Sequence, residues 1–175
     1  MSSQKHKRSA PAAKEKRTAS PSFKQTVTRV PALAEAFRPG LQALIEQDRK
    51  RLTSGDLATG SIDLDGTLRR QHPQDRRWDY GIGVHSQDGP EHVLWLEVHH
   101  AASGEAQAVV EKFAAMKGWL QQHAPALWAL PKVVVWLVSG GDHNPNDRRR
   151  RTALAEKHGI RRVSPPFDLA RLQKR

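Results

Sequence analysis

The chain has 175 residues, of which 37% are hydrophobic, and this is enough for one ordinary domain. Lys and Arg number 29 against 18 Asp and Glu, so the formal net charge of +11 favours a polyanionic partner, nucleic acid before an acidic membrane surface. The sequence has no cysteine, which excludes disulfides, thiol catalysis and cysteine-based zinc or iron–sulfur sites.

Membrane insertion and secretion are also disfavoured by the sequence. No apolar run approaches the roughly 20 residues that a membrane-spanning helix needs. No apolar segment near the N-terminus resembles a secretory signal peptide. We therefore expect a cytoplasmic protein that does not bind membranes.

The N-terminal segment differs in composition from the rest of the chain. Residues 1–30 carry eight Lys and Arg and a single Glu, and after Met1 the first 25 residues contain one large apolar side chain, Phe23. Such a segment buries too little surface to offset the entropy of ordering. We expect residues 1–30 to form a basic disordered tail and residues 31–175 a single α/β domain. The tail either contacts phosphates, through residues such as Lys5, Lys7 and Arg8, or only keeps the chain solvated.

One helix and three strands are predicted first along the domain. Residues 31–52 place apolar side chains on one helical face, with a break at a central Pro-Gly pair. Residues 61–68, 78–84 and 92–100 alternate between apolar and polar side chains, which is typical of strands. A Gln-Asp-Gly-Pro turn between the last two strands predicts a hairpin.

The second half of the chain predicts two helices and two strands. They are a helix over 103–123 capped by Ser103, a buried strand over 132–139, a helix from Asn144 to His158 before Gly159, and a strand over 160–163. Pro165-Pro166 is expected to end the regular structure. The order helix-strand-strand-strand-helix-strand-helix-strand predicts an α/β domain with a mixed central sheet flanked by helices.

Two carboxylates on the strands of the hairpin form the main candidate site. Asp79 lies in one strand and Glu97 in the next. Carboxylates on neighbouring strands can hold Mg²⁺ or Mn²⁺ through hard oxygen ligands, and such a metal stabilises charge on a phosphate and activates water. His99 follows two residues after Glu97 and shares its face, so it is a candidate nitrogen ligand, proton shuttle or phosphate contact.

These residues resemble the signature of the PD-(D/E)XK nuclease-like superfamily. That signature is an acidic residue on the second core strand and (Asp/Glu)-x-Lys on the third. Here the counterparts are Trp78-Asp79-Tyr80 and Leu96-Glu97-Val98-His99, within a topology that covers residues 31–163. The pattern also looks like that of a group of uncharacterised bacterial proteins, a likeness that carries no function.

The resemblance implies a restriction-endonuclease-like core that hydrolyses phosphodiester bonds in DNA or RNA, with Asp79 and Glu97 as metal ligands. His99 stands where the superfamily has lysine. In some members this lysine comes from the following helix, where Lys112 is the candidate, at the edge of the apolar stripe. It either reaches the site or extends along the helix into solvent. Glu46 on the first helix is a candidate auxiliary carboxylate. The alternative function is non-catalytic nucleic-acid binding or scaffolding on the same fold.

A second basic cluster lies near the C-terminus. Its centre is a run of four consecutive arginines, Arg148, Arg149, Arg150 and Arg151. On a helix these side chains point around most of the circumference, so they form no single reading face. They either contact a nucleic-acid backbone or form a solvated start to the helix.

A third hypothesis rests on a different group of acidic residues. The segment from Ile62 to Leu68 resembles the first motif of haloacid-dehalogenase-like phosphatases, and Gly141-Asp142 with Asp147 resembles their last motif. This less favoured hypothesis requires Asp63, Asp65 and Asp142 to meet at the C-terminal ends of adjacent strands.

The three hypotheses make different demands on the structure. Catalysis at the first site requires its four candidate residues to gather around one cleft. Salt bridges from both carboxylates to bases such as Arg76 and Arg77 would favour the non-catalytic protein.

Overall fold

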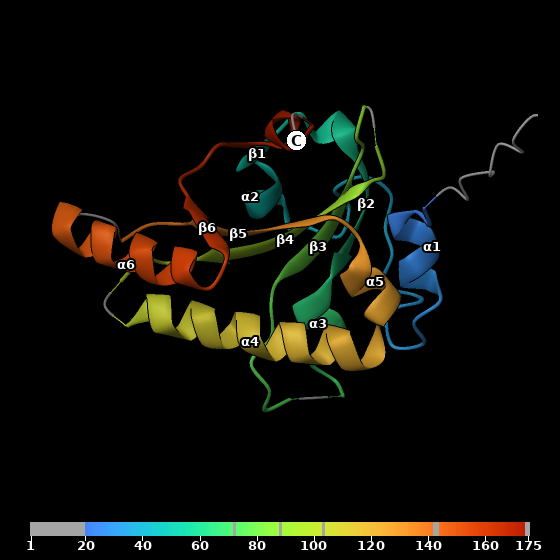
Figure 1. Ribbon diagram of the computed structural model, residues 1–175, viewed down its shortest axis with the longest axis horizontal. Coiled ribbons are helices and arrows are strands. Elements are labelled where there is room, and N and C mark those ends of the chain that lie inside the picture. The colour runs from blue at the N-terminus through green and yellow to red at the C-terminus, as the bar shows by residue number, and fades with distance from the viewer. Residues whose placement is uncertain (1–19, 72, 88, 103, 142–143, 174–175) are drawn as a thin grey trace, which may run out of the picture.

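The computed structural model of the protein describes residues 20–71, 73–87, 89–102, 104–141 and 144–173. Within them, one five-stranded sheet has the order β2-β3-β4-β5-β6 (Figure 1). Its strands are β2 (Ala58–Asp63), β3 (Tyr80–Val84), β4 (His92–His99), β5 (Lys132–Val138) and β6 (Ile160–Val163). The helices are α1 (Phe23–Thr28), α2 (Glu46–Arg49), α3 (Leu64–Leu68), α4 (Glu105–His123), α5 (Pro125–Ala129) and α6 (Pro145–Lys157). The remaining elements are the short strands β1 (Leu52–Thr53) and β7 (Phe167–Asp168) and the 3₁₀ turns Gly55–Leu57 and Leu169–Leu172.

The sheet combines an antiparallel meander with two parallel crossovers. β2, β3 and β4 are antiparallel in turn, whereas β4, β5 and β6 run parallel. α4 and α5 lie in the connection from β4 to β5, and α6 lies in the connection from β5 to β6. Two parallel neighbouring strands need such a crossover, because the chain must return to the end of the sheet at which the previous strand began. The predicted α/β class, a mixed sheet flanked by helices, is confirmed.

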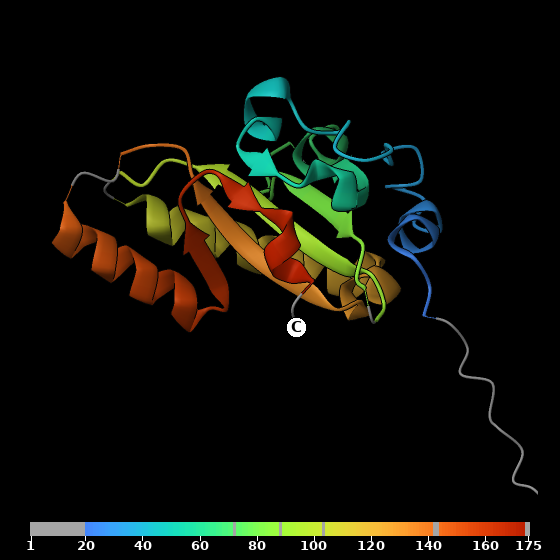
Figure 2. The same ribbon diagram turned by 90° about the horizontal axis from the view of Figure 1, so that it is seen from above.

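The two faces of the sheet carry separate hydrophobic clusters. α4 and α6 cover one face, with α1, α3 and α5 adding to the same cluster, and the segments 41–57 and 163–172 cover the other face (Figure 2). Along β4, Val93 and Trp95 belong to the α4 side, and Leu94 and Leu96 belong to the opposite side. The strand alternation expected from the sequence is therefore present, and it directs Glu97 toward α4. Alternation over residues 78–84 would place Trp78 and Tyr80 on one face of the sheet. Trp78 instead packs in the cluster on the α4 side and Tyr80 in the opposite one, because β3 begins only at Tyr80.

The predicted boundary of the N-terminal tail at residue 30 is wrong for its last part. α1 begins at Phe23 behind a capping box, in which Ser22 and Gln25 bond each other's backbone N–H groups. Phe23, Val27 and Val30 are almost completely buried in the main core. The sequence prediction failed because the apolar side chains are few but spaced at four and three residues, so α1 and the two residues after it direct all three toward the core. Residues 1–19, including Lys5, Lys7 and Arg8, lie outside the described residues.

The long helix expected over residues 31–52 is also absent. The segment forms successive turns and an isolated bridge between Arg38 and Ser61, and only α2 is helical. Gly40 has a φ of 52°, a conformation that interrupts a right-handed helix. Pro39 before it lacks the N–H that a continuing helix needs.

Two other strand ends differ from expectation. The strand predicted over 61–68 ends at Asp63, whose side chain accepts a hydrogen bond from the Gly66 N–H and begins α3. Regular structure also continues past Pro165-Pro166, since β7 pairs in parallel with β1. Sequence periodicity gives no signal for a two-residue strand whose partner lies more than 100 residues away.

The remaining boundaries agree closely with the sequence. Asn144 caps α6 through its side chain, Pro145 is the first helical residue, and Gly159 follows the helix with a φ of 77°. The expected cap of α4, Ser103, lies outside the described residues; Gly104, with a φ of 83°, directly precedes the helix. In the part of the chain that the structure describes, no helix has the length and apolarity needed to cross a membrane.

Candidate active site

The antiparallel pairing of β3 and β4 brings Asp79 and Glu97 together. Tyr80 pairs with Leu96, so Asp79, directly before β3, lies opposite Glu97 near the end of β4. The Asp79 carbonyl also accepts a hydrogen bond of 2.8 Å from the N–H of Leu64, which ties this residue to the start of α3. The strand register therefore sets the separation of the two carboxylates.

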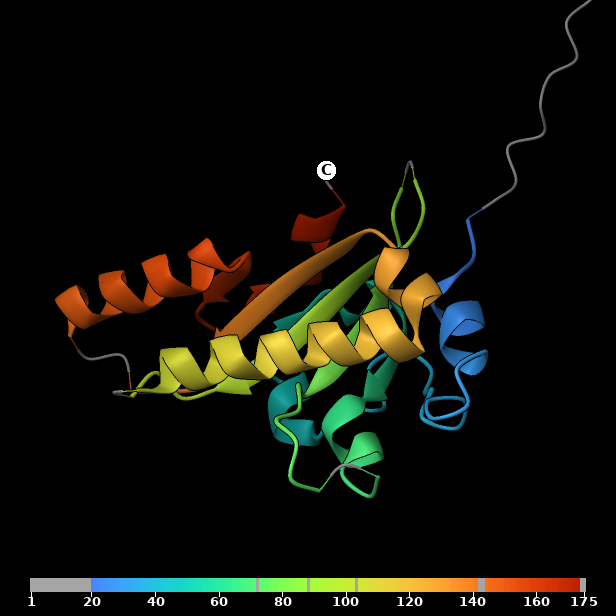
Figure 3. The ribbon, with the colours of Figure 1, turned by 60° about the horizontal axis from the view of Figure 1, so that its bottom comes forward.

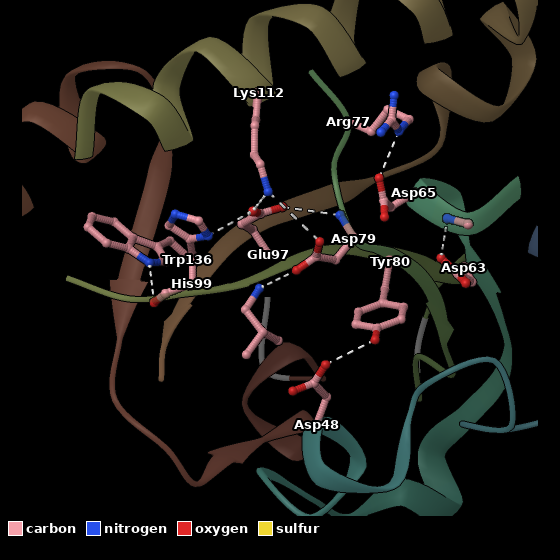
Figure 4. A network of polar contacts seen from close by, with 12 residues as sticks. Asp48, Asp63, Asp65, Arg77, Asp79, Tyr80, Glu97, His99, Lys112 and Trp136 are labelled. Atoms are coloured by element: carbon pink, nitrogen blue, oxygen red, sulfur yellow. Dashed lines mark hydrogen bonds and ion pairs between the residues drawn. The ribbon is translucent and has the colours of Figure 1, made fainter. Parts of the chain in front are cut away.

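Each carboxylate is fixed by a backbone group of the other strand. The Asp79 N–H donates to Glu97 Oε2 at 3.1 Å, and the Val98 N–H donates to Asp79 Oδ2 at 2.9 Å (Figure 4). This reciprocal arrangement uses one oxygen of each carboxylate. The other two oxygens, Glu97 Oε1 and Asp79 Oδ1, face the ammonium group of Lys112.

Lys112 reaches the carboxylates from α4, which lies across this face of the sheet (Figure 3). Its Nζ forms a short hydrogen-bonded ion pair with Glu97 Oε1 and lies 4.0 Å from Asp79 Oδ1. The lysine side chain is 23% exposed and that of Asp79 is 24% exposed, whereas Glu97 is completely buried. A small ion or a phosphate oxygen can thus approach through the Asp79 and Lys112 side of the cluster.

Burial perturbs all three ionisable groups. Burial, followed by the charge of Asp79, raises the pKa of Glu97 to about 8, although Lys112 opposes the shift. Burial also raises the pKa of Asp79. For Lys112 burial acts to lower the pKa, but the charge and hydrogen bond of Glu97 outweigh it, and the pKa is raised. The cluster thus contains two acids that resist ionisation beside a base that keeps its proton.

His99 joins the same cluster from the end of β4. Its Nδ1 lies 3.7 Å from Glu97 Oε1, and its Nε2 forms a short contact with a carboxylate oxygen of Glu105. The indole N–H of Trp136 donates to the His99 carbonyl at 3.1 Å (Figure 4). All four predicted site residues therefore come together.

Glu105 is a site residue that the sequence analysis missed. It begins α4, and its position predicted only a favourable interaction with the helix dipole. An available signal was its place six residues after His99, across a short loop, on the helix that also carries Lys112. Its side chain is 34% exposed.

The other candidates lie apart from this cluster. Glu46 is exposed on α2 and pairs with Lys50, and it does not contact the site, so its predicted auxiliary role is wrong. From the same helix Asp48, not Glu46, reaches the sheet, where it accepts a hydrogen bond of 2.9 Å from the Tyr80 hydroxyl. Arg76 pairs with Glu111 and Arg77 pairs with Asp65, and neither of these two ion pairs involves the site carboxylates.

The arginine run occupies the first half of α6. Arg148, Arg149 and Arg150 are exposed, and Arg151 is half-buried and lies 3.7 Å from Asp147. β4 and β5 run parallel, so both strands finish at the same end of the sheet. α4 follows β4 and α6 follows β5, and both helices therefore begin near that end (Figure 1). The arginines therefore lie toward the end of the sheet at which the acidic cluster lies.

The acidic residues of the phosphatase hypothesis do not show the arrangement it requires. Asp63 caps α3, and Asp65 is held by Arg69 and Arg77. β2 and β5 are separated by β3 and β4, so the strand before Asp63 is not adjacent to the strand before Asp142. Asp142 itself lies outside the described residues. The topology thus counts against this hypothesis.

The side-chain oxygens of Asp79 and Glu97 meet the requirements of a divalent metal only in part. Among the residues that the structure describes, no three His, Asp or Glu side chains are grouped closely enough to hold an ion as they stand. Two carboxylate oxygens free of backbone bonds nevertheless enclose one cationic group, the Lys112 ammonium. Hard oxygen ligands of this kind fit Mg²⁺ or Mn²⁺, with water completing the coordination.

Two hollows in the described part of the surface are lined by other residues than the four of the cluster. One small cavity of about 40 Å³ is lined by residues that include Trp78, the neighbour of Asp79, and Met116, one helical turn after Lys112. A wider groove runs between residues 31–43 and α3. The four site residues line neither of these two hollows, so neither hollow is the single cleft that the nuclease hypothesis requires.

Comparison of the chain with protein-family models, with curated proteins and with solved structures finds no match.

Proposed function

We propose that the protein is a metal-dependent nuclease-like hydrolase that cleaves phosphodiester bonds in nucleic acid. The observation that carries the proposal is the convergence of Asp79, Glu97 and Lys112 from two strands and a helix. Two acids and a lysine at the end of an antiparallel pair are the group that the nuclease resemblance implies. In this proposal the lysine comes from α4, because His99 takes its place on the strand.

The proposed fold is a restriction-endonuclease-like core. Its support is the sequence of a three-stranded meander, a crossover helix, a parallel strand, and a further helix and strand. The opening helix of that core is represented only by the short α1 and α2. The cytoplasmic localisation expected from the sequence stays a prediction.

Asp79 and Glu97 are the residues that would hold Mg²⁺ or Mn²⁺ at this site. When bound, such an ion supplies positive charge beside a phosphate and promotes ionisation of water. Lys112 keeps its proton and is partly accessible, so it stabilises negative charge that develops on the phosphate during P–O bond cleavage. His99 lies beside Glu97 and contacts the water or the phosphate.

The nucleic-acid partner is supported by charge. The exposed arginines of α6 lie toward the same edge of the sheet as the acidic cluster. A polyanionic backbone that contacts these arginines passes near Asp79 and Lys112. Contacts of this kind do not depend on base sequence, so the proposal is a nuclease without a built-in sequence preference.

The decisive experiment is cleavage of labelled DNA and RNA with Mg²⁺ or Mn²⁺ by the native chain, by Glu97→Ala and by Glu111→Ala. Glu111 is the matched control because it lies on α4, is 40% exposed and pairs with Arg76. We expect the Glu97 variant to lose about 10²-fold or more in rate, while the control keeps its activity.

The outcomes separate the hypotheses. Cleavage that survives Glu97→Ala rejects this site. If the native chain does not cleave but binds nucleic acid with a steep salt dependence, the non-catalytic alternative is correct. That alternative is supported by the Lys112 ion pair, which already satisfies Glu97 without a metal.

A further inference from the structure

A groove of about 700 Å³ runs between residues 31–43 and α3, and the proposed reaction does not use it. This volume falls within the roughly 300–1,000 Å³ of typical ligand sites. Arg38 lines one wall, and Arg70, two residues after the end of α3, lines the other. Both arginines are exposed. The groove is therefore open to solvent and bordered by a guanidinium group on each side.

The guanidinium group of Arg38 is held in place by the backbone. Its Nη1 donates to the carbonyl oxygens of Glu35 at 2.7 Å and of Phe37 at 2.8 Å. Among the residues that the structure describes, its Nε and Nη2 have no partner, and the side chain of Arg70 has none either. A guanidinium that is already fixed loses little freedom when it binds, and its planar fork suits two oxygens of a phosphate. The two arginines thus offer uncommitted donors to a phosphate in the groove.

Two amides and two carboxylates complete the polar lining of the groove. In the described part of the chain, the side chains of Gln42, Gln71 and Glu35 contact no polar partner. Asp63 accepts the Gly66 N–H through Oδ1 and leaves Oδ2 without a hydrogen bond. The carboxylates repel a ligand that carries only negative charge. The lining instead suits a ligand that combines phosphates with N–H donors.

Single-stranded nucleic acid has this combination of groups. Its phosphates match the arginines, and the Watson–Crick edge of every unpaired base carries both N–H donors and acceptors. In a duplex these edges bond to each other, so they cannot contact the groove. An amide side chain offers a donor and an acceptor at once, so Gln42 and Gln71 can bond any of the bases. The groove therefore selects for unpaired strands without selecting a sequence.

The groove lies next to the candidate active site. Asp63 lines it, and the N–H of the next residue, Leu64, donates to the Asp79 carbonyl at 2.8 Å. β2, which precedes α3, lies beside β3, whereas β5, which precedes α6, lies beyond β4. The acidic cluster on β3 and β4 thus lies between the groove and the arginines of α6. A strand that leaves the groove in this direction passes the cluster.

We propose that this groove binds a single strand of nucleic acid, with Arg38 and Arg70 on its phosphates and Gln42 and Gln71 on its base edges. The inference rests on the nucleic-acid partner of the proposed function and adds to it the strandedness of that partner. It requires neither a metal nor hydrolysis, so binding alone tests it.

The test measures binding to the full chain in EDTA by fluorescence anisotropy. The probes are a labelled DNA strand of mixed sequence, the same strand in a duplex, and an abasic strand of the same length. The variants are Arg70→Ala and the double variant Gln42→Ala with Gln71→Ala. Arg49→Ala is the matched control, because Arg49 is exposed, has no side-chain partner among the described residues, and lies on α2 at the opposite face of the sheet (Figure 2).

We expect Arg70→Ala to weaken binding of the single strand about fivefold, and to change binding of the duplex and the effect of Arg49→Ala to stay below about twofold. The slope of log affinity against log salt for the single strand should fall by about 0.7, the value for one lost phosphate contact. The glutamine variant should weaken binding of the strand with bases about threefold or more and leave the abasic strand unaffected. These side chains are exposed, so the variants should fold, which circular dichroism checks.

The contrary results differ in what they say about the proposed function. Equal losses for single strand and duplex in Arg70→Ala, or an equal loss in Arg49→Ala, reject the groove as a single-strand site and leave the proposed function standing. Equal losses for the abasic strand in the glutamine variant reject the base contacts in the same way. If the native chain binds none of the three probes at low salt, the nucleic-acid partner is wrong and both proposals fail. Selective loss of single-strand binding in Arg70→Ala, in a chain that does not cleave, supports the groove and rejects hydrolysis only.

Discussion

Two clusters of charged side chains lie at the same end of the sheet, and they differ in the ratio of acidic to basic groups. Asp65, on α3, is bound by two guanidinium groups, Arg69 and Arg77. Asp79 and Glu97, on the neighbouring strands, share the single ammonium group of Lys112. The first cluster has more basic than acidic groups, and the second has more acidic than basic groups.

The pKa values follow this difference. Burial acts to raise the pKa of Asp65, but the hydrogen bonds from Arg77 and Arg69 outweigh it, and the pKa is lowered. Burial raises the pKa of Asp79, and it raises that of Glu97 to about 8. Asp65 is therefore a stable carboxylate in a closed ion-pair network. The second cluster has too little positive charge to keep both acids ionised, so an added cation stabilises it.

Proximity of carboxylates alone therefore does not identify a site. Asp65 belongs to a sequence motif that resembles a phosphatase nucleophile region, yet its partners satisfy it. Asp79 and Glu97 match only a short, degenerate motif, yet they share one ammonium group and the pKa values of both are raised. The balance between acids and bases around each carboxylate separates the two.

The largest expected effect comes from removing a base from each cluster. Lys112→Met should reduce cleavage by about 10²-fold, since it removes positive charge beside the phosphate. Arg77→Met should lower stability and leave the cleavage rate within about threefold, because the proposed reaction assigns no role to its partner Asp65. The measurement is single-turnover cleavage with thermal melting of each variant. Lys117→Met, at an exposed position of α4, is the control for the loss of a lysine.

Equal losses of cleavage in the Lys112 and Arg77 variants would show that the two clusters act as one site, and would contradict the distinction between them.

The next effect is on the pH dependence of stability. Glu97 binds a proton more tightly in the folded chain, with a pKa of about 8, than in the unfolded chain, near its usual value of 4.5. Between these values the native state holds more protons, so stability should fall as pH rises from about 5 to 8, by a few kcal/mol at most. Glu97→Gln keeps the shape of the side chain but cannot ionise, and it should flatten this decline. Urea unfolding at several pH values measures it.

If Glu97→Gln loses as much stability as the native chain between pH 5 and 8, an ionisable group other than Glu97 causes the pH dependence. Asp79→Asn is the informative second variant, since the pKa of Asp79 is also raised.

The sequence predicted the convergence of the candidate site residues better than it predicted the surrounding fold. Alternation in β3 and β4 has a period of two, so the faces of Glu97 and His99 follow directly from their positions. Antiparallel pairing across a short turn then fixes Asp79 opposite Glu97. The crossover to a parallel strand requires a helix over this face, which brings Lys112 near.

The parts that failed depend on contacts between distant segments. Phe23 packs in the core through residues far along the chain, and its amide donates to Glu91, which composition alone does not reveal. The pairing of β1 with β7 joins the middle of the chain to its end. The contact of Glu105 with His99 depends on the conformation of the loop between them, for which no periodic pattern exists. Local periodicity therefore predicted elements, and tertiary contacts decided their ends.

A smaller effect is expected from the closed cluster itself. Asp65→Asn removes two ion pairs at a side chain that is 25% exposed, so it should cost about 1 kcal/mol of unfolding free energy. The cleavage rate should stay unchanged, whereas a phosphatase of the kind resembled would lose its activity toward a phosphomonoester. Both rates and the thermal midpoint are measured on the same preparation. Loss of phosphomonoesterase activity with intact stability would revive the phosphatase hypothesis.

The smallest effect concerns the basic helix beside the acidic cluster. Replacing Arg149 and Arg150 by alanine should weaken binding to DNA uniformly across sequences. It should lower the slope of log affinity against log salt by about 2, close to one released ion for each lost phosphate contact. Fluorescence anisotropy in EDTA measures binding without cleavage. The matched control replaces Arg49, the last residue of α2, and Lys50, which follows it; α2 belongs to the opposite face of the sheet (Figure 2). If the control pair lowers the slope as much as the α6 pair, the contacts come from overall charge. A change confined to α6 would place the polyanion along the end of the sheet where Asp79 and Glu97 lie.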